Sequence, residues 1–193
     1  MARPEQIVEL STDDEVILLK KLSPYGEVMV LMIRDIRFPF HKEDESSLLI
    51  DVFAQKHDGL QPIAFKDWKV MGTVANEGQN QHYYVTPRTY MEELAHKAWG
   101  HPFFLSAFAV SERYERNNLG SLLIATSLVA LNSRKVRTVM REGITKSGRR
   151  TWERFGVHWE EFAILIEPAL NHPFVEKVLF DFVPAGQIPF LYK

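Results

Sequence analysis

The sequence predicts a mixed α/β fold in a single domain over residues 1–193. Strand-like apolar runs alternate with helical patterns along most of the chain, which is the arrangement typical of this class. The 193 residues, of which 46% are hydrophobic and 25% charged, are enough for one sizeable core. No internal repeat, low-complexity tract or change in composition marks a linker.

The first third of the chain predicts one strand and two helices. Charged residues flank the apolar run Glu15–Lys20, which is typical of a short strand. Ser23 then stands as an N-cap before a proline, and this pair predicts a helix over Pro24–Arg37. A strand through Val28–Ile33 is the alternative there. A second helix is expected over Leu48–Lys56, because an Asp-Gly pair follows it.

The middle of the chain predicts a hairpin, a helix and a buried strand. Two strand-like runs, Lys69–Ala75 and Gln81–Val85, are separated by the polar turn Asn76–Asn80. A Thr-Pro pair then precedes a helical pattern over Arg88–Trp99. The run Phe103–Val110 is short and almost continuously apolar, so we expect a strand that is buried on both faces.

The last third of the chain predicts two helices and three strands. A pattern that is apolar on most faces predicts a helix over Leu119–Asn132, and the run Val136–Glu142 predicts a strand. A short helix is expected over Ser147–Phe155, since a glycine follows it. Two final strands are expected over Phe162–Ile166 and Val175–Val183.

Composition excludes several kinds of chemistry. The chain contains no cysteine, which rules out disulfides, a thiolate nucleophile and cysteine-ligated metal. The histidines show none of the spacings typical of a metal site, so no metal is expected. The formal net charge is -2, so no global field attracts nucleic acid or a membrane surface. No apolar signal segment or membrane-length run is present, and we expect a soluble cytoplasmic protein without a membrane partner.

A polar loop separates the strand Phe103–Val110 from the helix that begins at Leu119. Its segment ERNNLGS, residues 115–121, contains Asn and Gly, which tolerate a left-handed backbone and let successive N–H groups point into one concavity. The following helix adds about half a positive charge at its N-terminus. These features predict a pyrophosphate site, and an ordinary loop with Asn caps stays open as the alternative.

Residues 110–123, VSERYERNNLGSLL, and 151–157, TWERFGV, carry a resemblance to a known family. The first stretch resembles motif A of the GNAT superfamily of acyl-CoA-dependent N-acyltransferases, which reads roughly V-x-P-x-Y-R-G-x-G-x-G-x-x-L-L. The second is similar to the family's Y-E-K-L-G-F helix end, and the order of the expected elements also matches the family. Five residues of the first stretch occupy matching positions: Val110, Tyr114, Gly120, Leu122 and Leu123.

The resemblance implies a GNAT-like fold, which is a mixed, mostly antiparallel central sheet flanked by helices with a splayed pair of parallel strands. It also implies transfer of an acyl group, with acetyl expected, from an acyl-CoA such as acetyl-CoA to a small-molecule or macromolecular amine. Strand Phe104–Val110 would bind the pantetheine arm of the cofactor, and strand Val136–Glu142 would splay away to open a slot for the thioester. The cofactor-binding residues that the resemblance implies are Phe108, Ala109, Val110, Arg116, Asn117, Asn118, Leu119, Gly120 and Ser121.

Four features depart from the family pattern. Glu115 stands at the start of the phosphate loop where the family has Gln or Arg, and Asn118 replaces a glycine. Ser106 and Phe104 stand where many members carry a strand carboxylate. Trp152 replaces the tyrosine that protonates the leaving thiolate, and an indole N–H is a poor proton donor. The usual acid–base pair of the family is therefore missing.

Replacements for that pair are Glu142, at the end of the expected strand, and Ser106, which we take as the catalytic candidates. Each has a plainer interpretation, a solvated strand-end acid for Glu142 and a local hydrogen bond for Ser106. His101, Tyr83 and Tyr84 are further candidates, for which loop and hairpin packing roles stay open. Catalysis can also rest on positioning alone, or the chain can be a GNAT-like binding or assembly module with little catalysis.

Basic residues gather between positions 134 and 154. In the resembling fold this region flanks the adenosine end of the cofactor, so recognition of its 3′-phosphate is one interpretation. Binding of nucleic acid is another, since Mom-like transferases modify nucleobases and also depart from the standard catalytic set. A solvated helix face is the third interpretation, and a homodimer is also compatible with the sequence. The cluster comprises Arg134, Lys135, Arg137, Arg141, Lys146, Arg149, Arg150 and Arg154.

Overall fold

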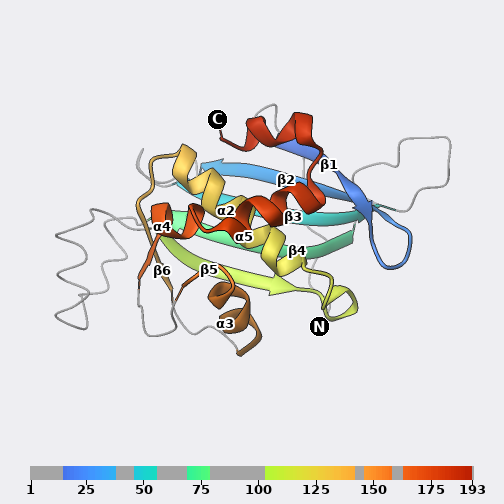
Figure 1. Ribbon diagram of the computed structural model, residues 1–193, viewed down its shortest axis with the longest axis horizontal. Helices are drawn as coiled ribbons and strands as arrows, with labels where there is room; N and C mark the ends of the chain where they lie inside the picture. Colours follow the sequence, from blue (N-terminus) through green and yellow to red (C-terminus); the bar gives the residue numbers. More distant parts are fainter. Residues whose placement is uncertain are drawn as a thin grey trace.

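The computed structural model describes residues 15–37, 46–55, 69–78, 103–141, 146–157 and 163–192. Within these ranges seven strands form one sheet in the order in which they follow along the chain, and helices lie against it (Figure 1). The fold class expected from the sequence is confirmed, because this sheet is mixed, mostly antiparallel and flanked by helices, with a parallel pair near one edge.

The sheet has long strands in its N-terminal part and short strands in its C-terminal part. Neighbouring strands are antiparallel except the fifth and sixth, which run parallel because a long helix carries the chain back between them. The strands are β1 (Glu15–Leu22), β2 (Val28–Arg37), β3 (Ser46–Gln55), β4 (Lys69–Gly78), β5 (Phe103–Val110), β6 (Thr138–Arg141) and β7 (Ala163–Leu165).

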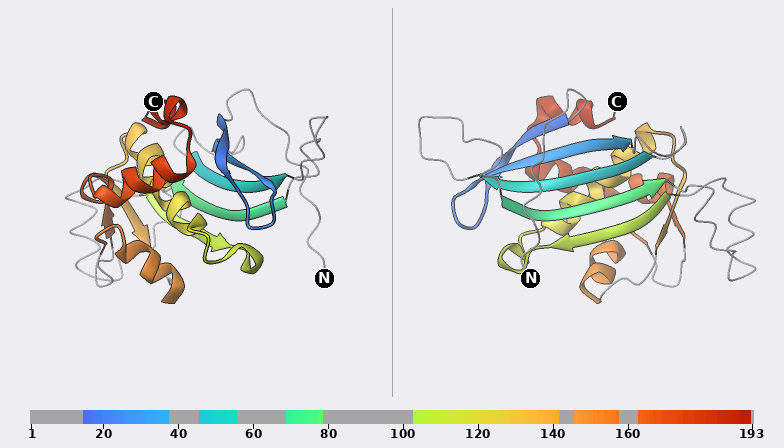
Figure 2. Two further views of the ribbon diagram at one scale, coloured as in Figure 1. Left: turned by 45° about the vertical axis from the view of Figure 1, so that its right-hand side comes forward. Right: turned by 180° about the vertical axis from the view of Figure 1, so that it is seen from behind.

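Two helices, α2 (Leu119–Ser133) and α5 (Pro173–Phe182), cover one face of the sheet. They lie in front of the strands in Figure 1 and behind them in the reversed view of Figure 2. α2 is buried almost throughout, since it contacts β3, β4 and β5 on one side and α4, α5 and η4 on the other. None of the helices described is long and apolar enough to cross a membrane. The others in these ranges are α3 (Lys146–Glu153), α4 (Ile166–Leu170) and the 3-10 helices η3 (Glu112–Tyr114) and η4 (Ala185–Tyr192).

The opposite face of the sheet is buried at its centre as well. Val30 and Met32 of β2 and Phe53 of β3 alternate with the residues of the helix-side core, and each is at most 4% exposed. Arg34 and Asp51 form an ion pair between the same two strands. β2 and β3 therefore bury side chains on both of their faces.

Two expected helices are wrong. The segments Pro24–Arg37 and Leu48–Lys56 contribute instead to β2 and β3, which pair in register from Val28 opposite Gln55 to Arg37 opposite Ser46. The alternative of a strand through Val28–Ile33 is confirmed. Because both faces of these strands are buried, their apolar residues do not alternate with polar ones, and the period of the sequence does not distinguish them from a buried helix.

The Ser-Pro pair that suggested a helix start forms a β-turn between β1 and β2. The N–H of Gly26 donates to the carbonyl of Ser23 at 3.0 Å, and the φ angle of Gly26 is 74°. Serine in the first position, proline in the second and glycine in the fourth are the preferences of a type I turn. The Oγ of Ser23 also accepts from the N–H groups of Tyr25 and Glu27, both at 3.1 Å.

The expected strand Val175–Val183 is wrong, since this segment is helix α5. Its buried residues recur at helical spacing, beginning with Val175 and ending with Phe182. His172 is the N-cap, and Pro173 occupies the first helical position. The sequence contains this helical spacing and the proline, but its high content of Val and Phe favoured the prediction of a strand.

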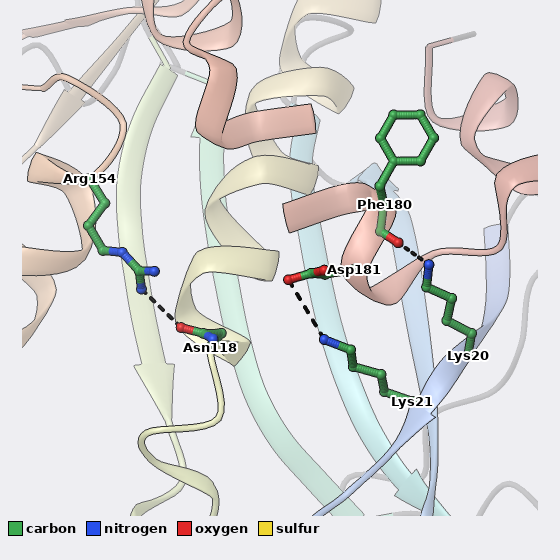
Figure 3. Close-up of polar contacts among 6 residues, drawn as sticks. All are labelled: Lys20, Lys21, Asn118, Arg154, Phe180 and Asp181. Carbon is green, nitrogen blue, oxygen red and sulfur yellow. Dashed lines mark hydrogen bonds and ion pairs between the residues drawn. The ribbon is translucent and has the colours of Figure 1, made fainter. Parts of the chain in front are cut away.

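Helix α5 is fastened to the edge strand β1 by two lysines (Figure 3). The Nζ of Lys20 donates to the carbonyl of Phe180, and the Nζ of Lys21 lies 3.7 Å from the carboxylate of Asp181. Lys21 also lies over the ring of Phe182, 4.7 Å from its centre. The contacts join the first described strand to the C-terminal helix.

The remaining elements are confirmed where the structure describes them, with shifted ends. β5 has the expected bounds, α2 ends one residue later than expected, and β1 and β4 are longer than expected. β6 lies inside the expected strand 136–142, and β7 lies inside the expected strand 162–166. α3 begins one residue earlier and ends two residues earlier than the expected helix 147–155. Burial of β5 on both faces is wrong at its end, because Ala109 is exposed. The expected strand Gln81–Val85 and helix Arg88–Trp99 lie outside the described residues.

Candidate anion-binding site

Strand β5 extends beyond the end of its parallel neighbour. The pairing of β5 with β6 covers Phe103 opposite Val139 through Leu105 opposite Arg141. β5 then continues to Val110, so residues 106–110 have no partner on β6 in the part of the chain that the structure describes. The two strands share only the beginning of β5, as expected for a splayed parallel pair.

A β-bulge interrupts β5 at Ser106. In the pairing with β4, Ala75 stands opposite Ala107 and Asn76 stands opposite Leu105, so Ser106 is an extra residue in the ladder. A bulge bends its strand and removes one residue from the regular hydrogen-bond pattern. The bend falls between the part of β5 that pairs with β6 and the part that does not.

The loop after β5 places two non-glycine residues in the left-handed region. The φ angles of Arg116 and Asn118 are 64° and 60°. The side-chain amide of Asn117 fixes this shape, because its Nδ2 donates to the carbonyls of Tyr114 at 3.2 Å and Glu115 at 2.9 Å. Alternation of left-handed and ordinary residues turns successive N–H groups toward one side, which makes an anion-binding concavity.

Asn118 is the N-cap of α2, but its side chain makes no capping hydrogen bond. The first N–H groups of a helix need acceptors from outside it, and an N-cap side chain ordinarily supplies one. At α2 these donors, with about half a positive charge from the helix dipole, face the loop concavity. The N-terminus of α2 is therefore arranged to receive an external anion.

A cavity of about 590 Å³, here named the β5–α2 cavity, lies at this place. Of the residues expected to bind the cofactor, all except Asn117 line it, and the amide of Asn117 instead shapes the loop. The end of β5, the loop and α3 form its walls, so the sequence-based prediction and the geometry select the same place. Its lining residues are Phe108, Ala109, Val110, Tyr114, Glu115, Arg116, Asn118, Leu119, Gly120, Ser121, Ser147, Gly148, Arg150, Thr151 and Arg154.

Arg154, at the end of α3, places its guanidinium at the N-terminus of α2. The Nη1 of Arg154 lies 3.0 Å from the Oδ1 of Asn118 (Figure 3). The same nitrogen lies 3.1 Å from the Oγ of Ser121. The guanidinium carbon also lies 4.3 Å from the centre of the Phe174 ring. These three contacts, two at the start of α2 and one on α5, hold the positive charge beside the first turn of α2.

The charged side chains that line the cavity are Arg116, Arg150, Arg154 and Glu115. Three arginines against one glutamate leave a net positive wall, and the helix N-terminus adds to it. Glu115 is exposed, as it must be if its carboxylate turns away from a bound anion. The electrostatics of the cavity suit a ligand with two or more negative charges.

Gly120 allows the close approach of α2, β5 and α3. A Cβ atom at this position would lie 3.3 Å from the Cζ of Phe108, 3.5 Å from the Cγ2 of Thr151 and 3.8 Å from the Cγ2 of Val110. Those three neighbours also line the cavity. A longer side chain at residue 120 therefore has to enter the cavity or displace its walls.

A buried hydrogen-bond cluster anchors the loop to the β1–β2 turn. The carboxyl group of Glu27 accepts from the Oη of Tyr114 at 2.7 Å and from the Oγ of Ser23 at 2.9 Å. Burial, followed by the hydrogen bond to Glu27, raises the pKa of Tyr114 to about 12. The guanidinium of Arg113 covers the ring of Tyr25, whose Oη donates to the carbonyl of Arg113 at 3.2 Å. Tyr114 belongs to the family-like motif, but no local pattern in the sequence predicts this support.

Trp152 is a packing residue. It is 2% exposed, and its ring centre lies 6.5 Å from that of Phe108. Its Nε1 is buried without a hydrogen-bond partner in the described part of the chain. An indole N–H does not ionise at accessible pH, so Trp152 supplies no general acid.

The catalytic candidates are only partly placed. Ser106 stands at the bulge of β5, and Glu142, His101, Tyr83 and Tyr84 lie outside the described residues. Their catalytic roles stay predictions. Among the residues that the structure describes, no three His, Asp or Glu side chains gather in a way that could hold a metal ion.

The basic cluster of residues 134–154 divides into separate groups. Arg134 and Lys135 lie at the C-terminus of α2, about 20 Å from its N-terminus at the rise of an α-helix. The Nη1 of Arg134 donates to the carbonyl of Ala130 at 2.8 Å. Lys135, with a φ angle of 59°, begins the reversal of the chain. Lys146 and Arg150 lie instead on α3 and Arg154 directly follows it, and Arg150 and Arg154 line the cavity.

The wall that α3 supplies is what the sequence analysis missed. Ser147, Gly148 and Thr151 line the cavity but were not assigned to a cofactor site, and Arg150 and Arg154, which also line it, were considered only as members of the basic cluster. Their spacing places them on one side of a helix, which is a signal the sequence contained. That this side meets the N-terminus of α2 depends on a contact between segments far apart in the chain.

Comparisons with known proteins give a single distant similarity to report. No protein-family model matches the sequence, and no curated protein matches it significantly. A solved structure, a point mutant of the cAMP-binding acyltransferase from Mycobacterium smegmatis, matches with a TM-score of 0.42 and 15% sequence identity. The match covers 86% of this chain and 56% of that chain, so this chain spans little more than half of the other's length. We base no functional conclusion on a similarity at this distance.

Proposed function

We propose that this chain is an N-acyltransferase of the GNAT type, which binds an acyl-CoA, acetyl-CoA in the first instance, in the β5–α2 cavity and transfers the acyl group to an amine. The observation that carries the proposal is the cavity itself, a positively charged hollow of about 590 Å³ at the N-terminus of α2, beside the end of β5. The motif that resembles the family, residues 110–123, supplies most of its wall.

The residues present fit the diphosphate of such a ligand. The uncapped N–H groups at the start of α2 and the loop before it are donors, and Arg116 and Arg154 are positive charges on either side of them. Hydrogen bonds between charged partners are about twice as strong as neutral ones, so these groups would supply most of the binding free energy. In this arrangement Arg154 takes the place of the Gln or Arg that the family carries where this chain has Glu115.

The end of β5 would bind the pantetheine arm. Residues 106–110 extend past β6, and Phe108, Ala109 and Val110 line the cavity. An acyl thioester supplies an activated carbonyl, and its transfer forms a carbon–nitrogen bond, breaks the carbon–sulfur bond and releases CoA as a thiol. The acceptor would be a primary amine of a small molecule or a macromolecule.

Proton transfer would depend on residues other than Trp152. Glu142 is our candidate for the base that takes the proton of the amine, and Ser106, at the bulge of β5, is the second candidate. Catalysis would otherwise rest on positioning of the two reactants, which accounts for a large part of many enzymatic rate enhancements.

Calorimetric titration with CoA and acetyl-CoA tests the ligand. We expect micromolar dissociation constants and a rise in melting temperature, because a ligand that binds only the folded state stabilises it. Gly120→Glu should abolish binding while circular dichroism shows a folded protein, and Arg154→Gln, on the surface, gives a second variant in case the first does not fold. Absence of binding to the parent protein at millimolar CoA would exclude the proposal.

Thioester consumption against polyamines, peptides, aminoglycosides and DNA tests the reaction. Glu142→Gln should lower turnover about a hundredfold if Glu142 is the base, and Ser106→Ala is measured beside it. If neither variant changes the turnover, the rate enhancement would come from positioning of the two reactants. CoA binding without consumption of thioester by any acceptor would favour the alternative function, a GNAT-like binding module, for which the missing tyrosine is the supporting observation.

A further inference from the structure

Strand β1 forms one border of the sheet (Figure 1). Its inner edge pairs with β2 from Glu15 opposite Ile33 to Leu18 opposite Val30, and within the described ranges no strand pairs with its outer edge. An edge strand presents a row of backbone N–H and C=O groups that can pair with another strand, and natural proteins usually protect it with lysines, a proline or a β-bulge. Without such protection, the outer edge of β1 is a template for a further strand.

The protective features of β1 are confined to its second half. The regular register with β2 ends at Leu18, and Lys20 and Lys21 follow in the irregular part of the strand. Both lysines are turned toward α5 and contact its residues 180–182 (Figure 3). The first half of the strand, residues 15–18, pairs regularly with β2 and contains no lysine, proline or bulge. This half of the edge is therefore unprotected.

Apolar side chains are exposed along the same strand. Val16 and Leu18 stand opposite Met32 and Val30 of β2, so they lie on the face of the sheet that points away from α2 and α5. Leu18 is 55% exposed. Exposed apolar side chains beside an open backbone edge favour pairing with another strand. Four of the large apolar side chains that are exposed in the described ranges belong to the hairpin of β1 and β2: Val16, Leu18, Leu22 and Tyr25.

The charges of β1 are complementary to those of a second β1 strand. In an antiparallel pair centred on Leu18, this residue stands opposite itself in the second copy, and Glu15 stands opposite Lys21. Glu15 and Lys21 both lie on the face of the sheet that α5 covers, because Glu15 pairs with Ile33 of the helix-side core and Lys21 contacts α5. The side chain of Lys21 is 48% exposed, so it remains accessible to a second carboxylate. Two-fold symmetry forms this ion pair twice.

We propose that β1 pairs with β1 of a second copy of this chain, antiparallel and about a two-fold axis at Leu18, so that the two seven-stranded sheets join into one. The sequence is compatible with a homodimer, and this edge supplies a specific interface for it. Such a pairing covers both unprotected edges at once and leaves none for a third chain. The interface is small, because each copy contributes one short strand, so we expect a dissociation constant in the micromolar range. The inference does not depend on the proposed function, since no residue that lines the β5–α2 cavity takes part.

Sedimentation velocity over a series of micromolar concentrations tests the interface. The parent should change from monomer to dimer along the series. Leu18→Lys places like charges directly opposite each other at the two-fold axis and should raise the dissociation constant at least about tenfold. Leu165→Lys makes the same substitution at an exposed leucine of β7, the other border of the sheet, and should dimerise as the parent does. Circular dichroism confirms that each variant is folded.

Cross-linking tests the register of the two strands. The chain contains no cysteine, so Leu18→Cys introduces a single thiol in each copy. Directly opposite residues of an antiparallel pair have Cβ atoms about 4.5–5.5 Å apart, which is close to the separation that a disulfide needs. Oxidised glutathione should therefore convert Leu18→Cys into a covalent dimer on non-reducing electrophoresis, whereas Leu165→Cys should stay monomeric.

Salt dependence tests the charge complementarity. The dimer of the parent should weaken as salt increases, because exposed ion pairs are screened, and Glu15→Gln should lose most of this dependence. A parent that stays monomeric throughout the concentration series overturns the proposal. A dimer that Leu18→Lys leaves intact also overturns it, and dissociation by Leu165→Lys instead would assign the contact to β7.

Discussion

The guanidinium of Arg154, the residue that follows α3, lies 3.0 Å from the side-chain oxygen of Asn118, the residue that precedes α2 (Figure 3). The same nitrogen lies 3.1 Å from the Oγ of Ser121. One side chain therefore joins the start of α2 to the end of α3, and residues of both helices line the β5–α2 cavity. It also occupies the position from which a cation can act on an anion at the start of α2.

Replacing Arg154 with glutamine should separate these two roles. We expect affinity for CoA to fall tenfold or more, because a charge-assisted contact beside the helix N-terminus is lost. The free energy of unfolding should change by less than about 1 kcal/mol, since exposed polar contacts contribute little. Calorimetry and urea unfolding measure the two quantities, with Arg149→Gln as the control. Unchanged affinity would show that Arg154 only tethers α3.

Arg116→Gly should move stability and binding in opposite directions. The φ angle of Arg116 is 64°, and an L-residue in this region costs about 1–2 kcal/mol, which exceeds the entropic cost of glycine. We expect a gain of up to about 1 kcal/mol in the free energy of unfolding. CoA affinity should fall, because the variant removes one of the positive charges that line the cavity. A parallel loss of both quantities in denaturation and titration would contradict the role given to Arg116.

The residues of the candidate site were more predictable from the sequence than the strands β2 and β3 of the sheet. The conformation of the segment 115–121 depends mainly on its own residues, because Asn and Gly at fixed positions favour a left-handed backbone wherever the loop lies. The strand before it and the helix after it are bounded by the same polar loop. Local chemistry and the family resemblance together selected residues that line the cavity, and whether these residues bind a cofactor stays a prediction.

The same reasoning offered β2 only as an alternative to a helix, and it did not recognise β3. Their burial on both faces removes the alternation that identifies a strand, and what covers each face is decided by distant parts of the chain. The turn Ser23–Gly26 begins with the same Ser-Pro pair that begins many helices, and only Gly26, at a φ angle of 74°, distinguishes the two. The contact of α3 with α2 was likewise beyond a local pattern, since it joins residues 36 positions apart.

Tyr114→Phe should destabilise the protein by about 2 kcal/mol, because it removes one donor to the buried carboxyl group of Glu27. The pKa of Tyr114 is raised from 10.0 to about 12 in the folded state, so folding favours its protonated form. Its contribution is therefore complete below pH 10 and is lost as the pH rises toward 12. Urea unfolding of parent and variant at several pH values measures the difference between them. A difference that stays constant through pH 12 would contradict the hydrogen bond.

Lys135→Gly should stabilise the C-terminus of α2 by about 0.5–1 kcal/mol. The N–H of Lys135 donates to the carbonyl of Asn132 at 2.9 Å, and that of Val136 donates to Leu131 at 3.0 Å. This is the Schellman arrangement, in which glycine is the preferred residue at a φ angle of 59°. Thermal unfolding measures the gain. CoA affinity should stay unchanged because Lys135 lies at the far end of α2, and weaker binding would place the ligand elsewhere.

Glu115→Gln should tighten CoA binding about two- to fivefold, because it removes the one negative charge among the side chains that line the cavity. The effect is small since Glu115 is exposed and water screens its charge. Glu112→Gln is the matched control, because Glu112 is exposed on η3 three residues earlier and does not line the cavity. Titrations of both variants at low and physiological salt measure the difference, which should shrink as salt increases. Equal effects of the two substitutions would mean that Glu115 acts on the ligand only as a long-range charge, as Glu112 does. Weaker binding by Glu115→Gln would mean that its carboxylate orders the loop and is a structural requirement of the proposed phosphate site.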